Sequence, residues 1–329
     1  MGRRVVASLA AVLVLAVTGT TAARDAVTVV GAREVVALAA RTLERLGLPG
    51  SVRAGGTDGG IAAFCAGTGP ETPDAVGTLR PLTDAETKAC TAAGITAVTD
   101  LRLGTGAAVL VTGPDGPGPS IGRRQLSEAL LAKLLVDGQL IANPFRTWAE
   151  IDPALPDRPI RVVGPAPGGD LYGILLDRVV EPGCAASPEL AALPAEAGPV
   201  CRTLRRDGAY VALEGGDAKV VAALVDDPAA VGVVGLGSAA APLRRIGLDG
   251  VAPDEEAIAS GRYPAGFPLH LVVKDAHRAA VTGLDRLLDG LLSEEALGPG
   301  GHLAGAGVVA PSAEDRVGLR ARISRLARP

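Results

Sequence analysis

The chain has 329 residues, of which 48% are hydrophobic and 21% are charged, and its formal net charge is −4. This length allows two lobes that each have a hydrophobic core, and the charges form no block of one sign, so a nucleic-acid-binding protein is not indicated. Aromatic residues make up only 2%, so Val, Leu, Ile and Ala must form most of the core. The histidines and cysteines show no metal-binding spacing, and we expect neither a metal nor a cofactor.

The first 23 residues have the pattern of a secretory signal peptide. Arg3 and Arg4 give a positive start, residues 5–17 are apolar, and residues 21–23 form a small-residue cleavage site. The alternative is an uncleaved membrane anchor, but about thirteen apolar residues are short for a membrane span. The pattern predicts export across the inner membrane, which leaves a soluble periplasmic or extracellular protein.

Strand and helix patterns alternate through the first 112 residues. Strands are predicted at residues 26–30, 51–54, 75–79, 98–103 and 107–112, and helices at residues 35–46, from the glycine-rich turn 56–60 onward, and at 84–93. Such alternation is typical of a mostly parallel sheet covered by helices. The Gly/Pro-rich break at residues 113–120 is predicted to be the crossover into a second lobe.

The alternation continues through the rest of the chain. Helices are predicted at residues 123–135, 171–180, 220–226, 279–292 and 313–326, and strands at residues 160–163, 231–236 and 269–273. Two glycine-rich turns, residues 56–60 and 164–170, precede helices and leave backbone N–H groups free for an anion. Two α/β lobes with such turns would hold a ligand in the cleft between them.

The four cysteines, Cys65, Cys90, Cys184 and Cys201, favour two disulfides in an exported chain. Four cysteines allow three pairings. We favour the sequential pairing, Cys65 with Cys90 and Cys184 with Cys201, because it closes two short loops. Each bridge would stabilise the fold by about 3 kcal/mol through restriction of the unfolded chain.

Several segments together resemble the phosphate-type solute-binding proteins of ABC importers, the family of the PstS phosphate-binding protein. They are GTDGGIAAFCAG at residues 56–67, the arm after it with Arg80 and Cys90, and the segments 147–165, 205–217, 226–236 and 263–274. The likeness covers nearly all of the mature chain in the same order. It implies an α/β, two-lobed periplasmic-binding-protein (Venus flytrap, type II) fold with two crossovers. Lobe one would comprise residues 26–112 and 259–329, and lobe two residues 113–258.

The resemblance also implies where a ligand binds, through hydroxyls, backbone amides and an arginine. The candidate ligand-binding residues are Ala32, Arg33, Glu34, Thr57, Asp58, Arg80, Gly169, Asp170 and Leu171. Thr57 keeps a hydroxyl and Arg80 keeps the arginine, whereas Glu34 and Asp170 stand in turns where the family has hydroxyl donors. Each charge-assisted hydrogen bond to an anion is worth roughly 1.5–3 kcal/mol, so the loss of three or four predicts impaired or absent phosphate binding.

Asp58, Asp170 and Arg80 could each have a structural role instead of a ligand-binding role. Asp58 and Asp170 can act as carboxylates that stabilise a helix N-terminus, worth about 0.3–1 kcal/mol each. Arg80 can form an internal ion pair with Asp58 or Asp170. Asp58, Asp170 and Arg80 can therefore serve either a structural role or a ligand-binding role.

The resemblance implies a binding protein and not an enzyme. The chain contains no G-x-S-x-G motif, which argues against a serine hydrolase. The implied partners are a small anionic ligand, phosphate by resemblance, and the membrane subunits of an ABC importer, with the protein itself a monomer. The alternative is a divergent member that binds another small ligand, for example one with an amine that Asp170 or Glu34 would meet, or that acts as a structural or signalling partner.

Overall fold

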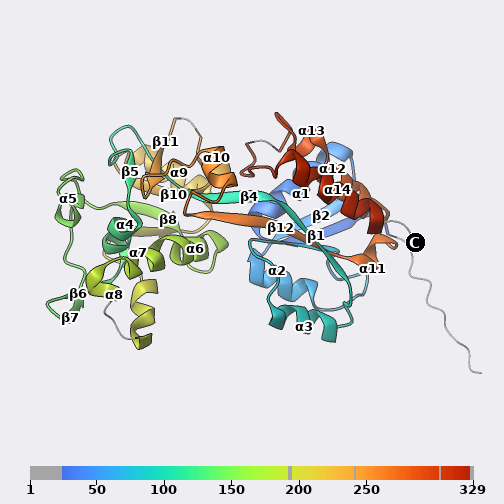
Figure 1. The fold of residues 1–329 in the computed structure, drawn as a ribbon, viewed down its shortest axis with the longest axis horizontal. Helices are drawn as coiled ribbons and strands as arrows, with labels where there is room; N and C mark the ends of the chain where they lie inside the picture. Colours follow the sequence, from blue (N-terminus) through green and yellow to red (C-terminus); the bar gives the residue numbers. More distant parts are fainter. Residues whose placement is uncertain (1–23, 192–194, 241, 304, 327–329) are drawn as a thin grey trace, which may run out of the picture.

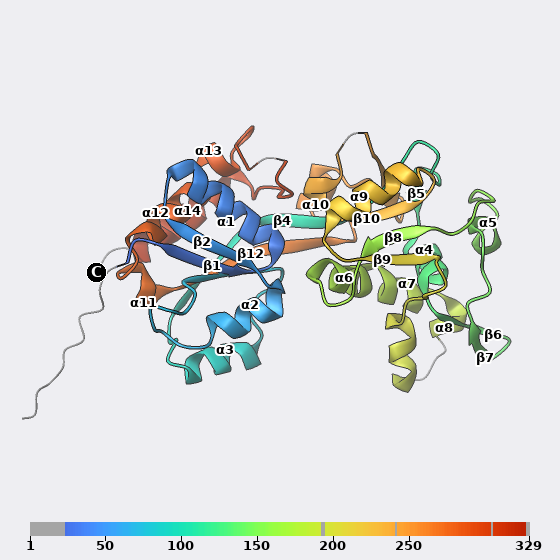
Figure 2. The same ribbon diagram turned by 180° about the vertical axis from the view of Figure 1, so that it is seen from behind.

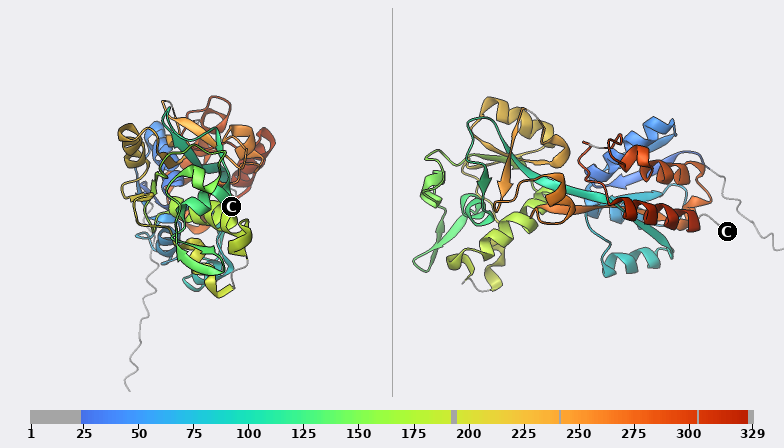
Figure 3. Two further views of the ribbon diagram at one scale, coloured as in Figure 1. Left: turned by 90° about the vertical axis from the view of Figure 1, so that its left-hand side faces the viewer. Right: turned by 45° about the horizontal axis from the view of Figure 1, so that its top comes forward.

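The computed structural model describes residues 24–191, 195–240, 242–303 and 305–326. The predicted signal peptide, residues 1–23, lies outside this described part. Two α/β lobes lie end to end and are joined by long strands, as Figures 1, 2 and 3 show. This is the two-lobed α/β architecture that the sequence predicted. Within the described residues, no helix has both the length and the apolar character needed to cross a bilayer.

Lobe one contains both ends of the described chain. Its first elements are β1 (Val27–Gly31), α1 (Arg33–Leu46), β2 (Gly50–Ala54), α2 (Gly56–Phe64), β3 (Ala75–Thr78) and α3 (Asp84–Ala92). Its last elements are α11 (Asp275–Arg278), α12 (Thr282–Leu291), α13 (Glu294–Leu297) and α14 (Ala313–Leu326). Helices α1 and α12 lie on one face of its sheet, and α2 and α3 lie on the other (Figure 1). These bounds are close to those predicted from periodicity.

Helix α1 shows why the periodicity succeeded. Its apolar residues recur three and four positions apart, and Val35, Leu38 and Ala39 are fully buried against the sheet. The helix ends where Gly47 adopts a left-handed conformation with φ of 59°, which a residue without a Cβ tolerates best. The amphipathic face therefore fixes the orientation of the first turn of α1, where Arg33 and Glu34 lie.

Lobe two follows the first long strand. Its elements up to the π-helical turn η1 are β5 (Ser120–Ile121), α4 (Arg123–Leu130), β6 (Lys133–Val136), β7 (Gln139–Ala142), α5 (Trp148–Ile151), β8 (Val162–Pro165), α6 (Asp170–Leu175) and η1 (Leu176–Val180). The others are α7 (Glu181–Ala185), α8 (Pro188–Ala191), the 3-10 segment η2 (Ala195–Arg202), β9 (Tyr210–Leu213), α9 (Asp217–Asp226), β10 (Val231–Gly235), η3 (Leu236–Ser238), β11 (Arg244–Leu248) and α10 (Glu255–Ala259). The single helix predicted over residues 171–180 is thus α6 continued by η1.

One twisted sheet runs through both lobes with the strand order β2-β1-β3-β12-β4-β10-β8-β9. Strand β1 is parallel to β2 and β3, and β8 is parallel to β9 and β10. The two central strands, β4 (Val98–Thr112) and β12 (Gly266–Lys274), are antiparallel to each other. The parallel pairs in each lobe are therefore joined through an antiparallel centre.

The chain crosses between the lobes inside β4 and not in the loop that follows it. Residues 98–107 pair with β12, and residues 108–112 pair with β10 of lobe two. The two separate strands predicted at residues 98–103 and 107–112 are therefore one continuous strand. The Gly/Pro-rich loop 113–120, predicted as the crossover, packs within lobe two, where Arg244 Nη2 donates to the Pro117 carbonyl at 3.0 Å.

The helix predicted over residues 123–135 ends early, at Leu130. The Asn143 side chain donates to the carbonyls of Glu128 and Leu131, both at 2.7 Å, and so satisfies groups that a longer helix would have used. Strands β6 and β7 follow as a hairpin whose turn has positive φ at Asp137 and Gly138. Asp-Gly is a favoured pair for such a turn, so a local turn signal overrode the helical pattern.

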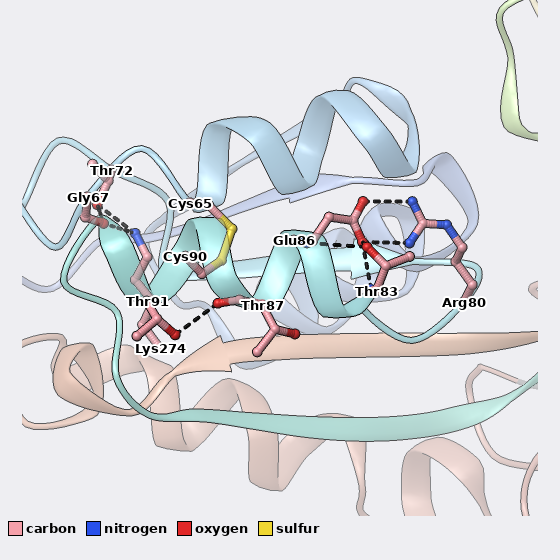
Figure 4. The surroundings of a disulfide bond; sticks show 10 residues. All are labelled: Cys65, Gly67, Thr72, Arg80, Thr83, Glu86, Thr87, Cys90, Thr91 and Lys274. Carbon is pink, nitrogen blue, oxygen red and sulfur yellow. Dashed lines mark hydrogen bonds and ion pairs between the residues drawn. A yellow bond between two sulfur atoms is a disulfide. The ribbon is translucent and has the colours of Figure 1, made fainter.

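The structure pairs Cys65 with Cys90 and Cys184 with Cys201, which is the pairing favoured from the sequence. The first bridge joins the end of α2 to α3 (Figure 4). The second closes the segment from α7 to η2 in lobe two. Each bridge therefore holds together two helical elements of one lobe.

A buried lysine anchors the loop after α2 to the end of β12. Lys274 is only 1% exposed, and its Nζ donates to the Gly67 carbonyl at 2.6 Å and to Thr72 Oγ1 at 2.7 Å (Figure 4). Nζ also lies 4.9 Å from the centre of the Phe64 ring. Burial lowers the pKa of Lys274 to about 8, although Asp74 opposes this shift.

Candidate ligand-binding site

A cavity of about 310 Å³ lies between the two lobes. Lobe one contributes the first turn of α1 and residues 54–56 at the start of α2, and lobe two contributes residues 165–171 and 213–217. Figure 2 shows α2 and α6 on the facing sides of the two lobes. Each wall is thus a turn that leads from a strand into a helix, as the glycine-rich segments predicted.

Asp170 of lobe two is bonded to the start of α2 in lobe one. Its Oδ1 accepts a hydrogen bond from the Thr57 backbone N–H at 2.9 Å. The N-terminus of α2 has no side-chain cap of its own, because Gly55 occupies the cap position. Helix N-terminal N–H groups attract anions, so the protein's own carboxylate takes the place of a bound anion. Asp170 therefore connects the two lobes across the cleft.

Thr57 does not offer its hydroxyl to the cavity. The residue is 5% exposed, and its Oγ1 accepts from the Leu79 backbone N–H at 3.2 Å inside lobe one. Ala32 is likewise part of the lobe core, fully buried, with its backbone N–H donating to the Gly77 carbonyl at 2.8 Å. Neither residue lines the cavity, and the Thr57 backbone N–H is donated to Asp170.

Arg80 is held outside the cavity by two carboxylates. Its guanidinium donates to both oxygens of Glu86 at 2.8 Å and to Asp58 Oδ1 at 2.7 Å (Figure 4 shows the Glu86 contacts). The hydrogen bonds that Arg80 donates to Glu86 raise the pKa of Arg80 above its ordinary value, and they lower the pKa of Glu86 to about 2. The Asp58 side chain is 88% exposed. Of the two ion pairs considered from the sequence, the structure forms the one with Asp58 and not the one with Asp170.

Arg33 reaches across the cleft to lobe two. Its guanidinium lies against Gly216, where a Cβ would collide with Nη1. Gly216 also has a φ of 80°, which favours glycine. Arg33 is thus the one arginine among the predicted site residues that lines the cavity.

Glu34 is the most perturbed group of the site. Its Oε2 is buried and has no hydrogen-bond partner. The pKa of Glu34 is raised to about 7, mainly by burial and also by the charges of Asp170 and Asp217, against the opposing effects of a backbone hydrogen bond and Arg33. Glu34 also lines a second, adjacent cavity of about 170 Å³.

Gly169 and Leu171 flank Asp170 and both line the cavity. Gly169 occupies the N-cap position of α6, and Leu171 is 7% exposed and packs into the core. Their contribution is to shape the wall, since neither carries a polar side chain.

The turn between β9 and α9 was not predicted from the sequence to belong to the site. Glu214 and Asp217 line the cavity there, and Asp217 Oδ2 accepts from the Gly235 backbone N–H at 2.9 Å. The signal was present, because Gly215 and Gly216 lie between a strand and a helix as in the other two turns. Four carboxylates, those of Glu34, Asp170, Glu214 and Asp217, therefore face one arginine around the cavity.

A family model described as a PBP superfamily domain matches residues 10–295 of the chain. Among solved structures, a possible phosphate-binding protein from Planctomyces limnophilus DSM 3776 is similar with a TM-score of 0.63 and 20% identity, over 93% of this chain and 100% of that chain. An ABC-type phosphate transport receptor from Vibrio cholerae has a TM-score of 0.58 and 16% identity, over 87% of this chain and 100% of that chain. A phosphate-binding protein from Stenotrophomonas maltophilia has a TM-score of 0.62 and 15% identity, over 90% of this chain and 93% of that chain.

No curated protein sequence matches the chain. At these identities the structural likenesses establish the fold alone. The family model, however, spans most of the sequence, and the two-lobed arrangement with a cavity between the lobes agrees with it. On these grounds the chain belongs to the PBP superfamily and is similar to PstS-type phosphate-binding proteins.

Proposed function

We propose that the protein is an extracytoplasmic solute-binding protein that holds a small ligand between its lobes and delivers it to an ABC importer. We further propose that this ligand is not phosphate. Membership of the PBP superfamily, the signal-peptide pattern of residues 1–23 and the inter-lobe cavity support the first part. The ligand would bind the closed arrangement of the lobes more tightly than the open one and so stabilise closure.

The observation that carries the second part is the hydrogen bond from the Thr57 N–H to Asp170. A phosphate at the start of α2 would have to displace this carboxylate and remain close to it. Two like charges about 4 Å apart repel by roughly 4 kcal/mol at an effective dielectric constant of about 20. That repulsion alone would weaken binding nearly a thousandfold, at about 1.4 kcal/mol per factor of ten.

The position of Arg80 supports the same conclusion. Its guanidinium is shared between Glu86 and Asp58, and breaking these contacts to reach an anion would forfeit several charge-assisted hydrogen bonds. Arg33 is the arginine nearest to an incoming ligand, and Glu34 beside it offsets its charge.

Two measurements on the mature protein test this function. Isothermal titration of the ligand-stripped protein with phosphate is expected to show no heat up to millimolar concentrations. A micromolar dissociation constant would contradict the proposal that the ligand is not phosphate.

The second measurement is native mass spectrometry of protein that was not stripped of ligand, or that was exposed to a fractionated metabolite extract. It is expected to show a bound small molecule. An Ala166→Trp variant, which fills the cavity wall, serves as the control and should lose that molecule. If the wild-type protein retains nothing that the variant loses, the solute-binding function fails and a structural or signalling role is favoured.

A further inference from the structure

Carboxylates from both lobes converge on the inter-lobe cavity. Glu34 comes from α1 in lobe one, and Asp170 and Asp217 come from α6 and α9 in lobe two. Asp170 and Asp217 both act on Glu34 through their charges, so the three groups belong to one electrostatic unit. Each of the two partners also accepts a backbone N–H, Asp170 from Thr57 and Asp217 from Gly235. Glu34 is the member that has an unpartnered oxygen.

The unpartnered oxygen is a second observation that points to a ligand. The Oε2 atom of Glu34 is buried without a donor, and an ionised carboxylate in such a place loses its hydration without compensation. Arg33, its neighbour in sequence, is directed to Gly216. A ligand that brought a positively charged N–H donor would supply what Glu34 lacks.

We propose that the cleft binds a small aliphatic cation with a primary amine or guanidinium group, which donates hydrogen bonds to Glu34 and is attracted by the nearby charges of Asp170 and Asp217. This inference rests on the proposed solute-binding function and names the class of solute. One cation held by carboxylates of both lobes would bridge them, and so would favour the closed arrangement.

The composition of the wall selects among cations. The residues that line the cavity include no aromatic side chain, whereas quaternary ammonium groups are recognised by aromatic faces. No group of three or more His, Cys, Asp or Glu side chains in the described ranges is placed to hold a metal ion. Carboxylates instead suit a cation with several N–H donors, such as an amine or a guanidinium.

The rest of the wall suits a short methylene chain. Leu171, Leu213 and Val220 contribute apolar surface beside the carboxylates. The volume of about 310 Å³ lies at the lower end of the range for small-molecule sites and exceeds what a single compact ion requires. An aliphatic amine of a few carbons therefore matches both the charge and the shape of the cavity.

Protonation of Glu34 would compete with the cation, which gives the site a recognisable pH dependence. The pKa of Glu34 is raised to about 7 by burial, with Asp170 and Asp217 adding to the shift and Arg33 opposing it. Glu214 lies on the rim of the same cavity, and Arg41 lines the adjacent one. Cation binding should therefore strengthen between about pH 6 and pH 8 and should release a proton from Glu34 at pH 7.

The test titrates the ligand-stripped mature protein with agmatine and with 1,4-diaminobutane, and uses choline, glucose and phosphate as contrasting probes. Agmatine or the diamine should bind, choline should bind at least tenfold more weakly, and titrations in buffers with different ionisation enthalpies should reveal proton release. A Glu34→Gln variant should bind the amine at least tenfold more weakly and without the pH dependence. The matched control is Glu44→Gln, which alters an exposed carboxylate on the same helix and should leave binding unchanged.

The outcomes separate this inference from the function on which it rests. If glucose, phosphate or a metabolite of the extract binds while both amines fail, the cationic ligand class is overturned and solute binding stands. If no solute binds at all, the solute-binding function itself fails. Equal loss of amine binding in the Glu34→Gln and Glu44→Gln variants would overturn the assignment of Glu34 to the site.

Discussion

Glu34 gives the sharpest test of the cavity's electrostatics in the unliganded protein. A Glu34→Gln substitution keeps the size of the side chain and removes its charge. Burial raises the pKa of Glu34 from 4.5 to about 7, which means that the folded protein holds this carboxyl proton more tightly than the unfolded chain does. The wild-type protein should therefore lose stability as the pH rises through the window from about 4.5 to 7.

The magnitude follows from the size of that shift. A change from 4.5 to about 7 corresponds to about 3 kcal/mol at about 1.4 kcal/mol per pKa unit. Below pH 4.5 the carboxyl is protonated in both states, so the shift contributes nothing to the difference between the variant and the wild type. Above pH 7 the Glu34 carboxyl is charged in both the folded and the unfolded state, and the full free-energy cost of burying the charge is present. The free energy of unfolding of the Glu34→Gln variant minus that of the wild type should therefore be about 3 kcal/mol larger above pH 7 than below pH 4.5.

Urea unfolding of the wild-type protein, the Glu34→Gln variant and the Glu44→Gln control measures this effect from pH 4 to pH 8, with the disulfides intact. The free-energy difference between the first two should grow through the window, and the exposed Glu44 control should follow the wild type. A difference that stays constant from pH 4 to pH 8 would refute the placement of Glu34 Oε2 as a buried carboxylate oxygen without a hydrogen-bond partner.

Four further substitutions test other parts of the structure. Asp170→Ser frees the Thr57 N–H at the start of α2 and should strengthen phosphate binding at least a hundredfold, measured by titration; an unchanged affinity would contradict the capping role of Asp170. In the wild type, the free energy of unfolding should rise between about pH 8 and 10.5, because Lys274 loses its proton at lower pH in the folded protein than in the unfolded chain. Lys274→Met should abolish this rise, and a rise that persists in urea unfolding of the variant would contradict the lowered pKa of Lys274. Arg80→Ala should cost about 1 kcal/mol in urea unfolding and leave agmatine binding unchanged, whereas lost binding would place Arg80 in the site. Replacing Cys184 and Cys201 together by Ser should lower the free energy of unfolding by about 3 kcal/mol, and a negligible loss in the same assay would show that the bridge does not constrain the unfolded chain.

The sequence predicted elements well where one local force dominates. Helix α1 follows from apolar spacing, and α3 begins after Thr83, which forms a capping box with Glu86 and is likewise a local signal. The helix predicted over residues 123–135 failed because apolar residues at 134 and 135 belong to a hairpin that Asp137 and Gly138 close. The lobe crossing was misplaced for a similar reason, since a glycine- and proline-rich loop signals a turn and does not show which lobe holds it.

The site was harder to predict because its contacts join distant parts of the chain. The Asp170–Thr57 bond spans 113 residues, so the sequence could name both residues without showing that they meet. Of the two partners considered for Arg80, Asp58 is confirmed, but Glu86, which lies only six residues away on α3, was not foreseen. Asp217 was missed although Gly215 and Gly216 precede it, since a glycine turn alone does not reveal which turns face one another across a cleft.

The carboxylates that we propose to weaken anion binding are also the groups that we propose to favour an amine. A helix N-terminus stabilises whatever anion lies there, and in this protein that anion is the carboxylate of Asp170. Once bound, a carboxylate still has acceptor capacity on its remaining lone pairs, and it presents that capacity to the cavity together with Glu34. An acceptor-rich cavity favours a ligand that donates hydrogen bonds and carries positive charge. The proposed lack of phosphate binding and the proposed binding of an amine therefore follow from the same carboxylates, and the Asp170→Ser and Glu34→Gln variants should move the two affinities in opposite directions.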